Sequence, residues 1–213
     1  MSRYARNLEQ LDQKGVEVVS SVRLADMCGI NPAQIRKDLA YFGQFGVRGV
    51  GYYVKELLSE IGKILGLDKE WRLCLVGVGN LGLALLSHAR FANRGYKFVA
   101  AFDRKPKIIG AKIGDIEVAP LSAMNSLVKE KWIEIGVIAA RPAWAQKAAD
   151  MLARAGVCAI LNFSPIQLHC PAAHVFIENV DLSLKLDVLS YRLTSARSRR
   201  HRIPRILGMH TKK

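Results

Sequence analysis

Hydrophobic residues recur at helical spacing in the first third of the chain and form short continuous runs in the remainder. The helical spacing predicts helices over residues 3–13, 22–28, 33–42 and 54–65. In the remainder, apolar runs of strand length alternate with helical stretches, which is typical of a parallel sheet covered by helices. We therefore expect an α/β protein in which a helical domain precedes a Rossmann-type, doubly wound parallel sheet with right-handed crossovers.

The apolar runs of the predicted sheet lie at residues 72–76, 98–102, 115–118, 132–140 and 157–163. The helical stretches between them lie at residues 83–91, 121–127 and 142–155. A polar break at residues 66–70 separates the sheet from the N-terminal helices. We therefore place a first domain at residues 1–66 and the Rossmann domain at residues 71–180.

The C-terminal segment, residues 181–213, begins with an unusually apolar helix. Asp181 is its N-cap candidate, and apolar side chains surround most of the circumference of residues 181–193. A helix with this profile has to be buried, either against a second subunit or against its own domain. Residues 195–213 form an arginine-rich tail, which is usually only solvated but here could add nonspecific affinity for DNA.

The charge balance indicates a polyanionic partner. The 213 residues include 32 Lys and Arg against 18 Asp and Glu, which gives a formal net charge of +14. No apolar run approaches the roughly 18 residues of a membrane span, and the first residues are polar, so we expect a cytoplasmic protein without a membrane partner. The cysteines lie too far apart in the sequence for a structural zinc site, and no metal site is expected.

The third predicted helix has the features of a DNA-reading element. A glycine turn separates it from the helix before, and Asn31-Pro32 supplies an N-cap and a first-turn proline. The polar candidates for contacts with bases and phosphates are Gln34, Arg36 and Lys37. Residues 43–53 are punctuated by glycine, as in a hairpin wing, and Arg48 at the turn is able to enter a minor groove. The alternative is a small helical domain whose basic residues only solvate one face.

A glycine loop connects the strand at residues 72–76 to the helix that follows. It fits the dinucleotide-binding pattern G-x-G-x-x-G: Gly77, Val78, Gly79, Asn80, Leu81 and Gly82. In this pattern Gly77 allows the tight turn, Gly79 lets the backbone approach a pyrophosphate, and Gly82 lets the helix pack on the strand. The pyrophosphate is expected at the helix N-terminus. The alternative is a glycine-rich core turn that binds no ligand.

An acidic residue follows the next predicted strand, about 20 residues beyond the loop, as in NAD-binding domains. Asp103 is able to accept both hydroxyl groups of a ribose, and its carboxylate would repel a 2′-phosphate. NAD(H) is therefore favoured as the cofactor. Arg104 and Lys105 follow directly, and either is able to pair with the phosphate of NADP(H).

Ligands of doubly wound sheets bind beyond the carboxyl ends of the strands. Two sets of residues follow predicted strands there: Ala139, Ala140 and Arg141, and then Asn162, Phe163 and Ser164. We expect these residues to form walls around a nicotinamide. The alternative for each of them is an ordinary loop position.

Four motifs occur in a fixed order: residues 34–43 (QIRKDLAYFG), residues 48–52 (RGVGY), the loop ending in GNLG, and residues 178–181 (ENVD). In these motifs, and over residues 4–193, the chain resembles the Rex family of bacterial redox-sensing transcriptional repressors. The resemblance implies a homodimer with an N-terminal winged helix, a C-terminal NAD(H) domain and a last helix swapped into the partner. It also implies that Tyr41 and Gly49, within the first two motifs, contact DNA.

The resemblance further implies an effect of the cofactor on DNA binding. NAD⁺ would permit repression of genes for NADH reoxidation, and NADH would release the double-stranded operator. Two recognition helices in successive major grooves require an operator that is an inverted repeat. For this coupling, NADH has to prefer the DNA-incompetent arrangement of the two subunits.

The resemblance also implies an inter-subunit switch. Family members often join an arginine of the first helix, a tyrosine of the glycine-loop helix and an aspartate of the swapped helix in a redox-sensitive network. Arg6, His88 and Asp181 occupy those places here, so a titratable histidine replaces the tyrosine. In addition, Arg141 stands where the family more often has an apolar residue before proline.

An NAD-dependent dehydrogenase with an appended basic domain is the alternative function. Such an enzyme needs a general base and an orienting cation opposite the nicotinamide. His88, His169 and His174 belong to no recognisable catalytic motif, and the sequence leaves little room for a substrate domain. We therefore expect a regulator and not an enzyme.

Overall fold

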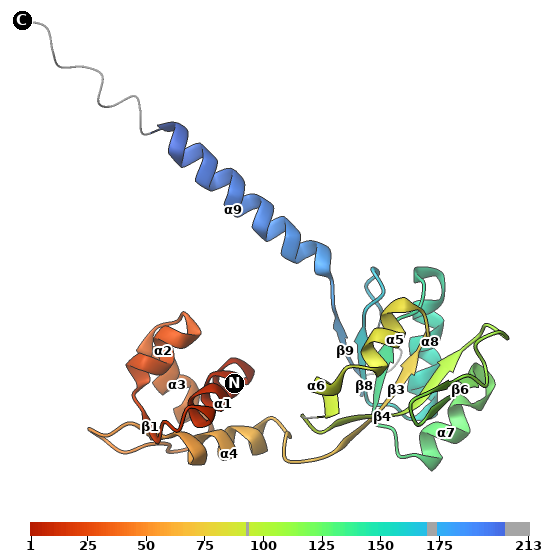
Figure 1. The fold of residues 1–213 in the computed structure, drawn as a ribbon, viewed down its shortest axis with the longest axis horizontal. Helices are drawn as coiled ribbons and strands as arrows, with labels where there is room; N and C mark the ends of the chain where they lie inside the picture. Colours follow the sequence, from red (N-terminus) through yellow and green to blue (C-terminus); the bar gives the residue numbers. More distant parts are fainter. Residues whose placement is uncertain (93, 170–173, 203–213) are drawn as a thin grey trace, which may run out of the picture. The chain divides into compact units, whose positions relative to one another are not determined.

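A computed structural model describes residues 1–92, 94–169 and 174–202 of the protein (Figure 1). The chain forms two compact units. The first comprises Met1–Glu70 and Arg90–Tyr96, and the second comprises Trp71–Ala89 and the residues from Lys97 onward. The short segment Arg90–Tyr96, which the sequence pattern assigned to the Rossmann domain, therefore packs with the first unit.

Helices make up most of the first unit: α1 (Ser2–Gln13), α2 (Ser21–Cys28), α3 (Pro32–Phe42) and α4 (Val54–Ile64). The helices predicted here are confirmed, and their caps explain their bounds. Ser20 Oγ accepts the Arg23 N–H at the start of α2, and Asn31 Oδ1 accepts the Ala33 N–H at the start of α3. The side chains that the four helices turn inward are apolar and fully buried, among them Leu8, Leu24, Ile35, Leu39 and Ile61.

A short strand pair and a loop form the wing of this unit. β1 (Val18–Val19) pairs antiparallel with β2 (Tyr52–Tyr53), and Val47 forms a bridge with Gly51 in the loop before β2. Gly46 and Gly51 have positive φ values, and a Cβ on either would lie 2.6 Å from a backbone oxygen. Only glycine fits both positions, so the glycine punctuation of the sequence sets the path of the wing.

The second unit is built on a seven-stranded sheet in the order β5-β6-β4-β3-β7-β8-β9. Its strands are β3 (Trp71–Val76), β4 (Tyr96–Asp103), β5 (Lys112–Ile113), β6 (Ile116–Pro120), β7 (Ile135–Ile138), β8 (Ala159–Asn162) and β9 (Phe176–Asn179). The pairs β3–β7, β7–β8, β8–β9 and β4–β6 are parallel, whereas β5 runs antiparallel to β6. Because the strand order reverses at β3, the sheet is doubly wound, as predicted.

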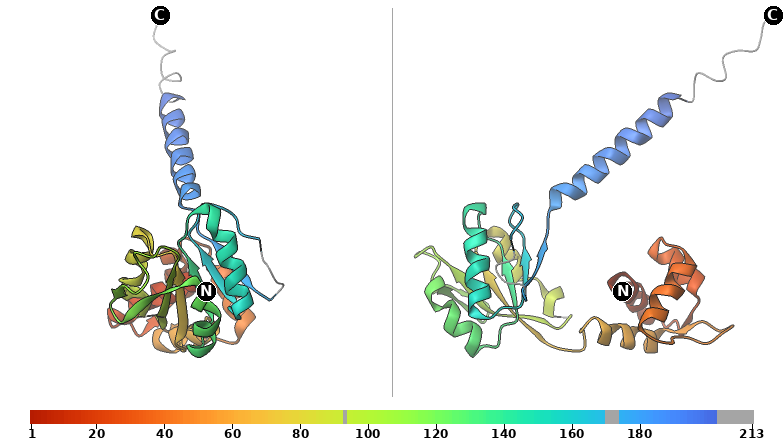
Figure 2. Two further views of the ribbon diagram at one scale, coloured as in Figure 1. Left: turned by 90° about the vertical axis from the view of Figure 1, so that its right-hand side faces the viewer. Right: turned by 180° about the vertical axis from the view of Figure 1, so that it is seen from behind.

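The helices of this unit follow the strands: α5 (Asn80–Leu86), η1 (Leu121–Ala123), α7 (Met124–Glu130) and α8 (Pro142–Ala155). The short helix α6 (Ala89–Ala92) begins at the last residue of this part of the unit, and its other residues belong to the first unit. α7 and α8 lie side by side on the sheet (Figure 2). Ala145, Ala148, Ala149 and Leu152 of α8 are buried, which confirms the predicted inward face of that helix.

Three expectations about the second unit need correction. The strand expected at residues 132–140 is shorter, because Trp132, with a φ of 52°, belongs to the turn after α7. The helix expected at residues 83–91 starts at Asn80 and is interrupted where the polar Ser87 and His88 break the apolar periodicity. The sequence pattern also did not predict β5 or β9.

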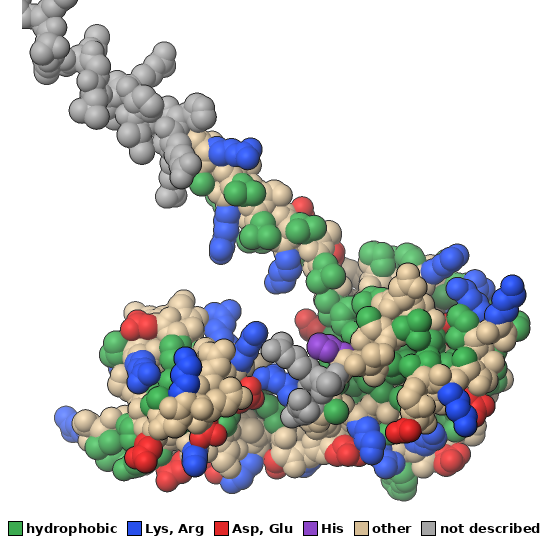
Figure 3. Space-filling view, viewed as in Figure 1, with side chains coloured by type: hydrophobic (Ala, Val, Ile, Leu, Met, Phe, Trp, Pro, Cys, Tyr) green, Lys and Arg blue, Asp and Glu red, His purple; other side chains and the backbone are tan. Residues whose placement is uncertain are grey.

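The last helix, α9 (Leu182–Arg202), is longer than the predicted residues 181–193. Its apolar side chains are exposed, with Leu186 63% and Tyr191 73% accessible, and hydrophobic side chains lie open along it in Figure 3. Of the two expected ways to bury this helix, packing against its own domain is therefore wrong, because these side chains stay exposed there. Residues 203–213 of the predicted basic tail lie outside the described residues.

Candidate nucleotide and DNA sites

The three glycines of the loop after β3 are constrained in different ways. Gly77 has a φ of 99°, and a Cβ there would lie 2.7 Å from the Ala139 carbonyl oxygen. A Cβ on Gly82 would lie 2.2 Å from the Gly77 carbonyl oxygen, so α5 approaches the loop too closely for any side chain. A Cβ on Gly79 would meet nothing within 4 Å. Protein packing thus requires Gly77 and Gly82, whereas Gly79 borders open space.

Asp103 ties the end of β4 to the glycine loop. Its side chain is buried, Oδ2 accepts the Val78 N–H at 2.8 Å, and Oδ1 accepts the Lys105 N–H at 2.9 Å. An ionised carboxylate offers about four lone-pair positions. Both oxygens therefore retain capacity for a further donor, such as a ribose hydroxyl.

A pocket of about 710 Å³, its open mouth included, lies over this loop. It is lined by Val76, Gly77, Gly79, Asp103, Arg104, Lys105, Leu121, Ala139, Ala140, Arg141, Trp144, Lys147, Ala148 and Met151. Six predicted cofactor residues are among them: Gly77, Gly79, Asp103, Arg104, Ala139 and Ala140. The other six lie outside this lining: Val78, Asn80, Leu81, Gly82, Asn162 and Ser164.

Positive charge dominates the lining. The lining contains one carboxylate, that of Asp103, and four basic side chains: Arg104, Lys105, Arg141 and Lys147. The Arg104 guanidinium lies 4.5 Å from the centre of the Trp144 ring and the Lys147 ammonium 5.0 Å from it, both within cation–π range. This arrangement suits a ligand that carries several phosphate charges and an aromatic base.

Sequence reasoning missed the contribution of α8 to the pocket. Trp144, Ala148 and Met151 are spaced by four and three residues, so they form one face of a helix. That helix begins at Pro142, two residues after the predicted candidates Ala139 and Ala140. The periodicity of residues 142–155 was therefore the available signal.

Asn162 and Ser164 occupy the turn after β8. The Asn162 amide donates to the carbonyl oxygens of Ser164 and Ile166 and to Asn179 Oδ1, and its own Oδ1 accepts the Ser164 N–H. Asn162 therefore has a structural role in this turn. Ser164 is also buried, but its Oγ has no hydrogen-bond partner among the described residues. A buried hydroxyl of this kind is usually satisfied by a ligand or by water.

The outer face of α3 is polar. Ile35 and Leu39 are buried, while the DNA-contact candidates of this helix are exposed: Gln34, Arg36, Lys37 and Tyr41. Arg36 Nη1 donates to Ser21 Oγ at 3.1 Å, which links α3 to the first turn of α2. A groove lined by Ser20, Ser21, Arg36 and the wing residues brings Arg36 close to the exposed Arg48 and Gly49. Of the predicted DNA contacts, the structure thus brings Arg36, Arg48 and Gly49 together at one groove, while Gln34, Lys37 and Tyr41 are exposed on α3 outside its lining.

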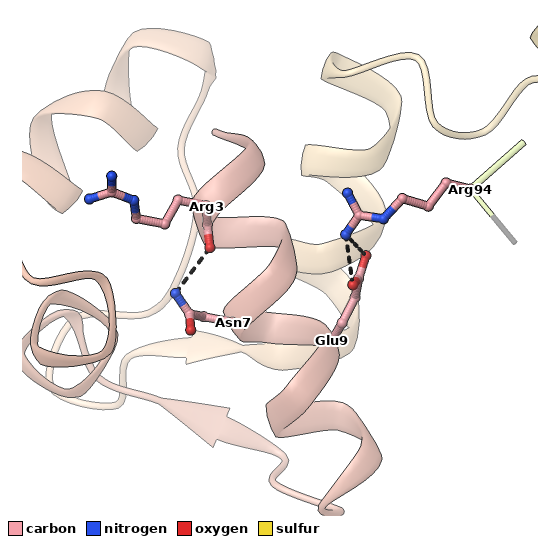
Figure 4. Close-up of polar contacts among 4 residues, drawn as sticks. All are labelled: Arg3, Asn7, Glu9 and Arg94. Carbon is pink, nitrogen blue, oxygen red and sulfur yellow. Dashed lines mark hydrogen bonds and ion pairs between the residues drawn. The ribbon is translucent and has the colours of Figure 1, made fainter. Parts of the chain in front are cut away.

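Polar contacts also hold α1 in place (Figure 4). Arg3 Nη1 donates to the Cys28 carbonyl oxygen of α2 at 3.0 Å, and Asn7 donates to the Arg3 carbonyl oxygen at 3.0 Å. Arg94 forms an ion pair with Glu9 at 3.0 Å. The segment that leads from α6 into β4 is thereby attached to α1.

The three residues of the expected switch lie on separate elements. Arg6 is exposed on α1, and His88 is exposed between α5 and α6. Asp181 caps α9: its Oδ1 accepts the Ser183 N–H at 2.8 Å and the Ser183 hydroxyl at 2.6 Å. These bonds, the hydroxyl first, hold the pKa of the Asp181 carboxyl below its usual value. The structure shows a capping role for Asp181, and the joint switch stays a prediction.

Within the described residues, no group of three or more His, Cys, Asp or Glu side chains is placed to hold a metal ion. In the same part of the chain, no helix combines the length and apolarity that crossing a bilayer requires.

Comparison with known proteins agrees with the two-unit architecture. Residues 1–40 match the family model of a putative DNA-binding protein N-terminus, and residues 68–166 match that of a CoA-binding domain. The crystal structure of RSP in complex with NAD⁺ and operator DNA superposes with a TM-score of 0.87, at 40% identity, covering 94% of this chain and 92% of that one. RSP in complex with NADH superposes with a TM-score of 0.86, at 38% identity, covering 94% and 93% of the two chains.

Curated relatives match along almost the whole chain. The redox-sensing transcriptional repressor Rex of Syntrophobacter fumaroxidans is 47% identical over 91% of this chain and 92% of its own length. The protein of the same name from Desulforamulus reducens is 49% identical over 91% of each chain. With identity and coverage of this extent, the chain belongs to the Rex family of redox-sensing transcriptional repressors.

Proposed function

We propose that this chain is a homodimeric transcriptional repressor that binds inverted-repeat operator DNA and releases it when NADH binds. One observation carries the proposal: an exposed α3 and wing occur in the same chain as a cationic pocket over a glycine loop. Both features lie in a fold shared with RSP, which binds NADH and operator DNA. Such a regulator acts in the cytoplasm, where the chromosome and the NAD(H) pool are found.

The nucleotide lies along the loop in this proposal. The pyrophosphate approaches the backbone at Gly79, where no side chain intervenes, and the adenine ribose lies at Asp103. Arg104 and Lys105 follow that carboxylate in the chain, and Arg141 also lines the pocket, so several cations are available to the phosphates. The charge of the lining supports a dinucleotide over an uncharged ligand.

The nicotinamide points toward the ends of β7 and β8. Ala139 and Ala140 give that side of the pocket an apolar wall. The Ser164 hydroxyl, which has no hydrogen-bond partner in the described part of the chain, follows β8 by two residues, and we infer that the nicotinamide carboxamide satisfies it. Asn162 contributes indirectly by fixing the turn that carries Ser164.

α3 and the wing supply the DNA contacts. Gln34 and the other exposed side chains of α3 enter a major groove, and Arg48 at the wing enters the adjacent minor groove. Two copies of the chain present two such surfaces, which matches an operator with two-fold symmetry.

Lys37→Ala and Arg48→Ala should each weaken operator binding and leave the affinity for NADH in the absence of DNA unchanged. A lost phosphate contact lowers the slope of log affinity against log salt by about one, whereas a lost base contact relaxes the preference at one position. Mobility shifts at several salt concentrations separate these outcomes. Lys129→Ala, which removes an exposed lysine from α7, is the matched control. Unchanged operator affinity in both test variants would remove α3 and the wing from the interface.

The proposal as a whole is tested by measuring operator binding with no nucleotide, NAD⁺, NADH or NADPH. We expect NADH to weaken binding far more than the other two, because reduction changes the charge and shape of the nicotinamide and Asp103 disfavours a 2′-phosphate. Linkage requires that operator DNA weakens NADH binding by the same factor. Equal effects of all three nucleotides would contradict redox sensing. The alternative function, a dehydrogenase, is not favoured, because the relatives that match 91% of the chain are named as repressors.

A further inference from the structure

Asp38 is an acidic residue in the middle of α3, the helix assigned to the DNA interface. A carboxylate in that position would repel the phosphates of a bound duplex. The structure gives it two donors: Tyr4 of α1 donates its hydroxyl to Oδ2, and Gln34 donates Nε2 to Oδ1, each at 2.5 Å. Asp38 therefore connects a buried residue of α1 to an exposed residue in the first turn of α3.

The two hydrogen bonds favour the ionised form of Asp38 and the protonated form of Tyr4. The bonds from Tyr4 and then from Gln34 hold the pKa of the Asp38 carboxyl below its usual value. Burial, followed by the bond to Asp38, raises the pKa of the Tyr4 hydroxyl. At neutral pH Tyr4 is thus a donor and Asp38 is an ionised acceptor.

An ionised carboxylate only accepts hydrogen bonds, so the Gln34 amide has to turn its NH₂ group toward Asp38. One of the two amide N–H bonds is then occupied. The other N–H and Oε1 remain for a partner outside the protein. Gln34 is exposed and is the third residue of α3, in the turn from which recognition helices reach base edges.

We propose that Asp38 is a positioning residue which restricts Gln34 to reading adenine in the operator. This inference rests on the proposed function, because it requires α3 to lie in the major groove. A glutamine with one donor and one acceptor matches the N7 and N6 amino group of adenine. A glutamine with both N–H groups free is also able to donate twice to the N7 and O6 acceptors of guanine. Asp38 removes that second possibility, because it holds one of the two N–H groups.

The test is operator binding by a series of duplexes in which each base pair of the half-site is replaced symmetrically. The wild type should prefer A·T over G·C at one position by roughly 5–150-fold per half-site, as expected for a bidentate contact. Asp38→Ala should reduce that preference to less than about 3-fold while the other positions keep theirs. Gln34→Ala should lose the same preference, and the double variant should lose no more than either single variant.

Controls separate positioning from folding. Asp26→Ala removes an exposed carboxylate from α2 and should leave every base preference unchanged. Asp38→Ala leaves the buried Tyr4 hydroxyl without its acceptor and could unfold the first unit. The pair Tyr4→Phe and Asp38→Ala removes that hydroxyl as well, and a thermal melt confirms that this variant is folded.

Two results would overturn the proposal. One is an undiminished preference for A·T at that position in the folded Asp38 variants, and the other is additive losses in the Gln34 and Asp38 double variant. Both differ from a failure of the proposed function. In that case Lys37→Ala and Arg48→Ala would also leave operator binding unchanged.

Discussion

Gly79→Val should abolish the response of operator binding to NADH and leave operator binding without nucleotide unchanged. The backbone at Gly79 has a φ of −89° and a ψ of −168°, which any residue adopts, and a Cβ there meets no protein atom within 4 Å. The variant should therefore fold. The new side chain would occupy the space through which the pyrophosphate reaches the backbone. If two charged hydrogen bonds of roughly 1.5–3 kcal/mol each are lost, the affinity for NADH falls at least about 100-fold.

Two further glycine variants sharpen this test. Gly62→Val adds the same side chain at an open glycine of α4, outside the pocket, and should keep the NADH response. Gly82→Ala would push a Cβ to 2.2 Å from the Gly77 carbonyl oxygen, so it should destabilise the second unit, by about 1–3 kcal/mol. Calorimetric titration with NADH and a thermal melt distinguish loss of ligand from loss of fold. If Gly79→Val still bound NADH normally, the loop would not be the pyrophosphate site.

Elements that bury one apolar face were predictable from the sequence, because burial sets the spacing of their apolar residues. α3 and α8 show this well. Asn31 with Pro32 fixes the start of α3, and Ile35 and Leu39 mark the buried side of that helix. In α8 the periodicity indicated both the limits of the helix and its contact with the sheet.

Elements held mainly by backbone hydrogen bonds have no regular spacing of apolar residues in the sequence. β9 follows β8 in parallel register, but Phe176 is 77% exposed, and Glu178 and Asn179 are exposed as well. A strand with exposed side chains lacks both the apolar run and the alternation that identify strands. Its position depends on pairing with a strand that lies more than ten residues earlier in the chain.

The candidate site also combines features that the local sequence predicts with features that depend on contacts between distant segments. The glycine loop was predictable, because close approach of backbone atoms requires glycine at fixed spacing. The hydrogen bond that the Val78 N–H donates to Asp103, and the contact of Arg104 with Trp144, depend on how separate segments meet. The attachment of Arg94 to Glu9 is of the same kind, since 85 residues separate the two. Local pattern carries no information about such pairs.

Leu186→Glu combined with Leu189→Glu should convert the dimer to monomers and reduce operator affinity by about 1,000-fold or more. Two apolar stripes run along α9, at about 100° per residue. One contains Leu182, Leu186, Leu189 and Leu193, and the other contains Leu184, Val188 and Tyr191. They lie on roughly opposite sides of the helix, as expected for a helix inserted between two surfaces. Burying each leucine contributes roughly 1.5–3 kcal/mol, so we propose that the second subunit covers α9.

The size of the loss follows from the two-fold operator. A monomer engages one half-site, and its affinity falls toward the nonspecific level, which is roughly 10³–10⁷ weaker than specific binding. Sedimentation should give 23.6 kDa for the variant and twice that mass for the wild type. Lys185→Gln with Arg192→Gln, at polar positions between the stripes, should keep the dimer. A Leu186 and Leu189 variant that stays dimeric would show that α9 does not hold the subunits together, because carboxylates cannot be buried unpaired in an apolar interface.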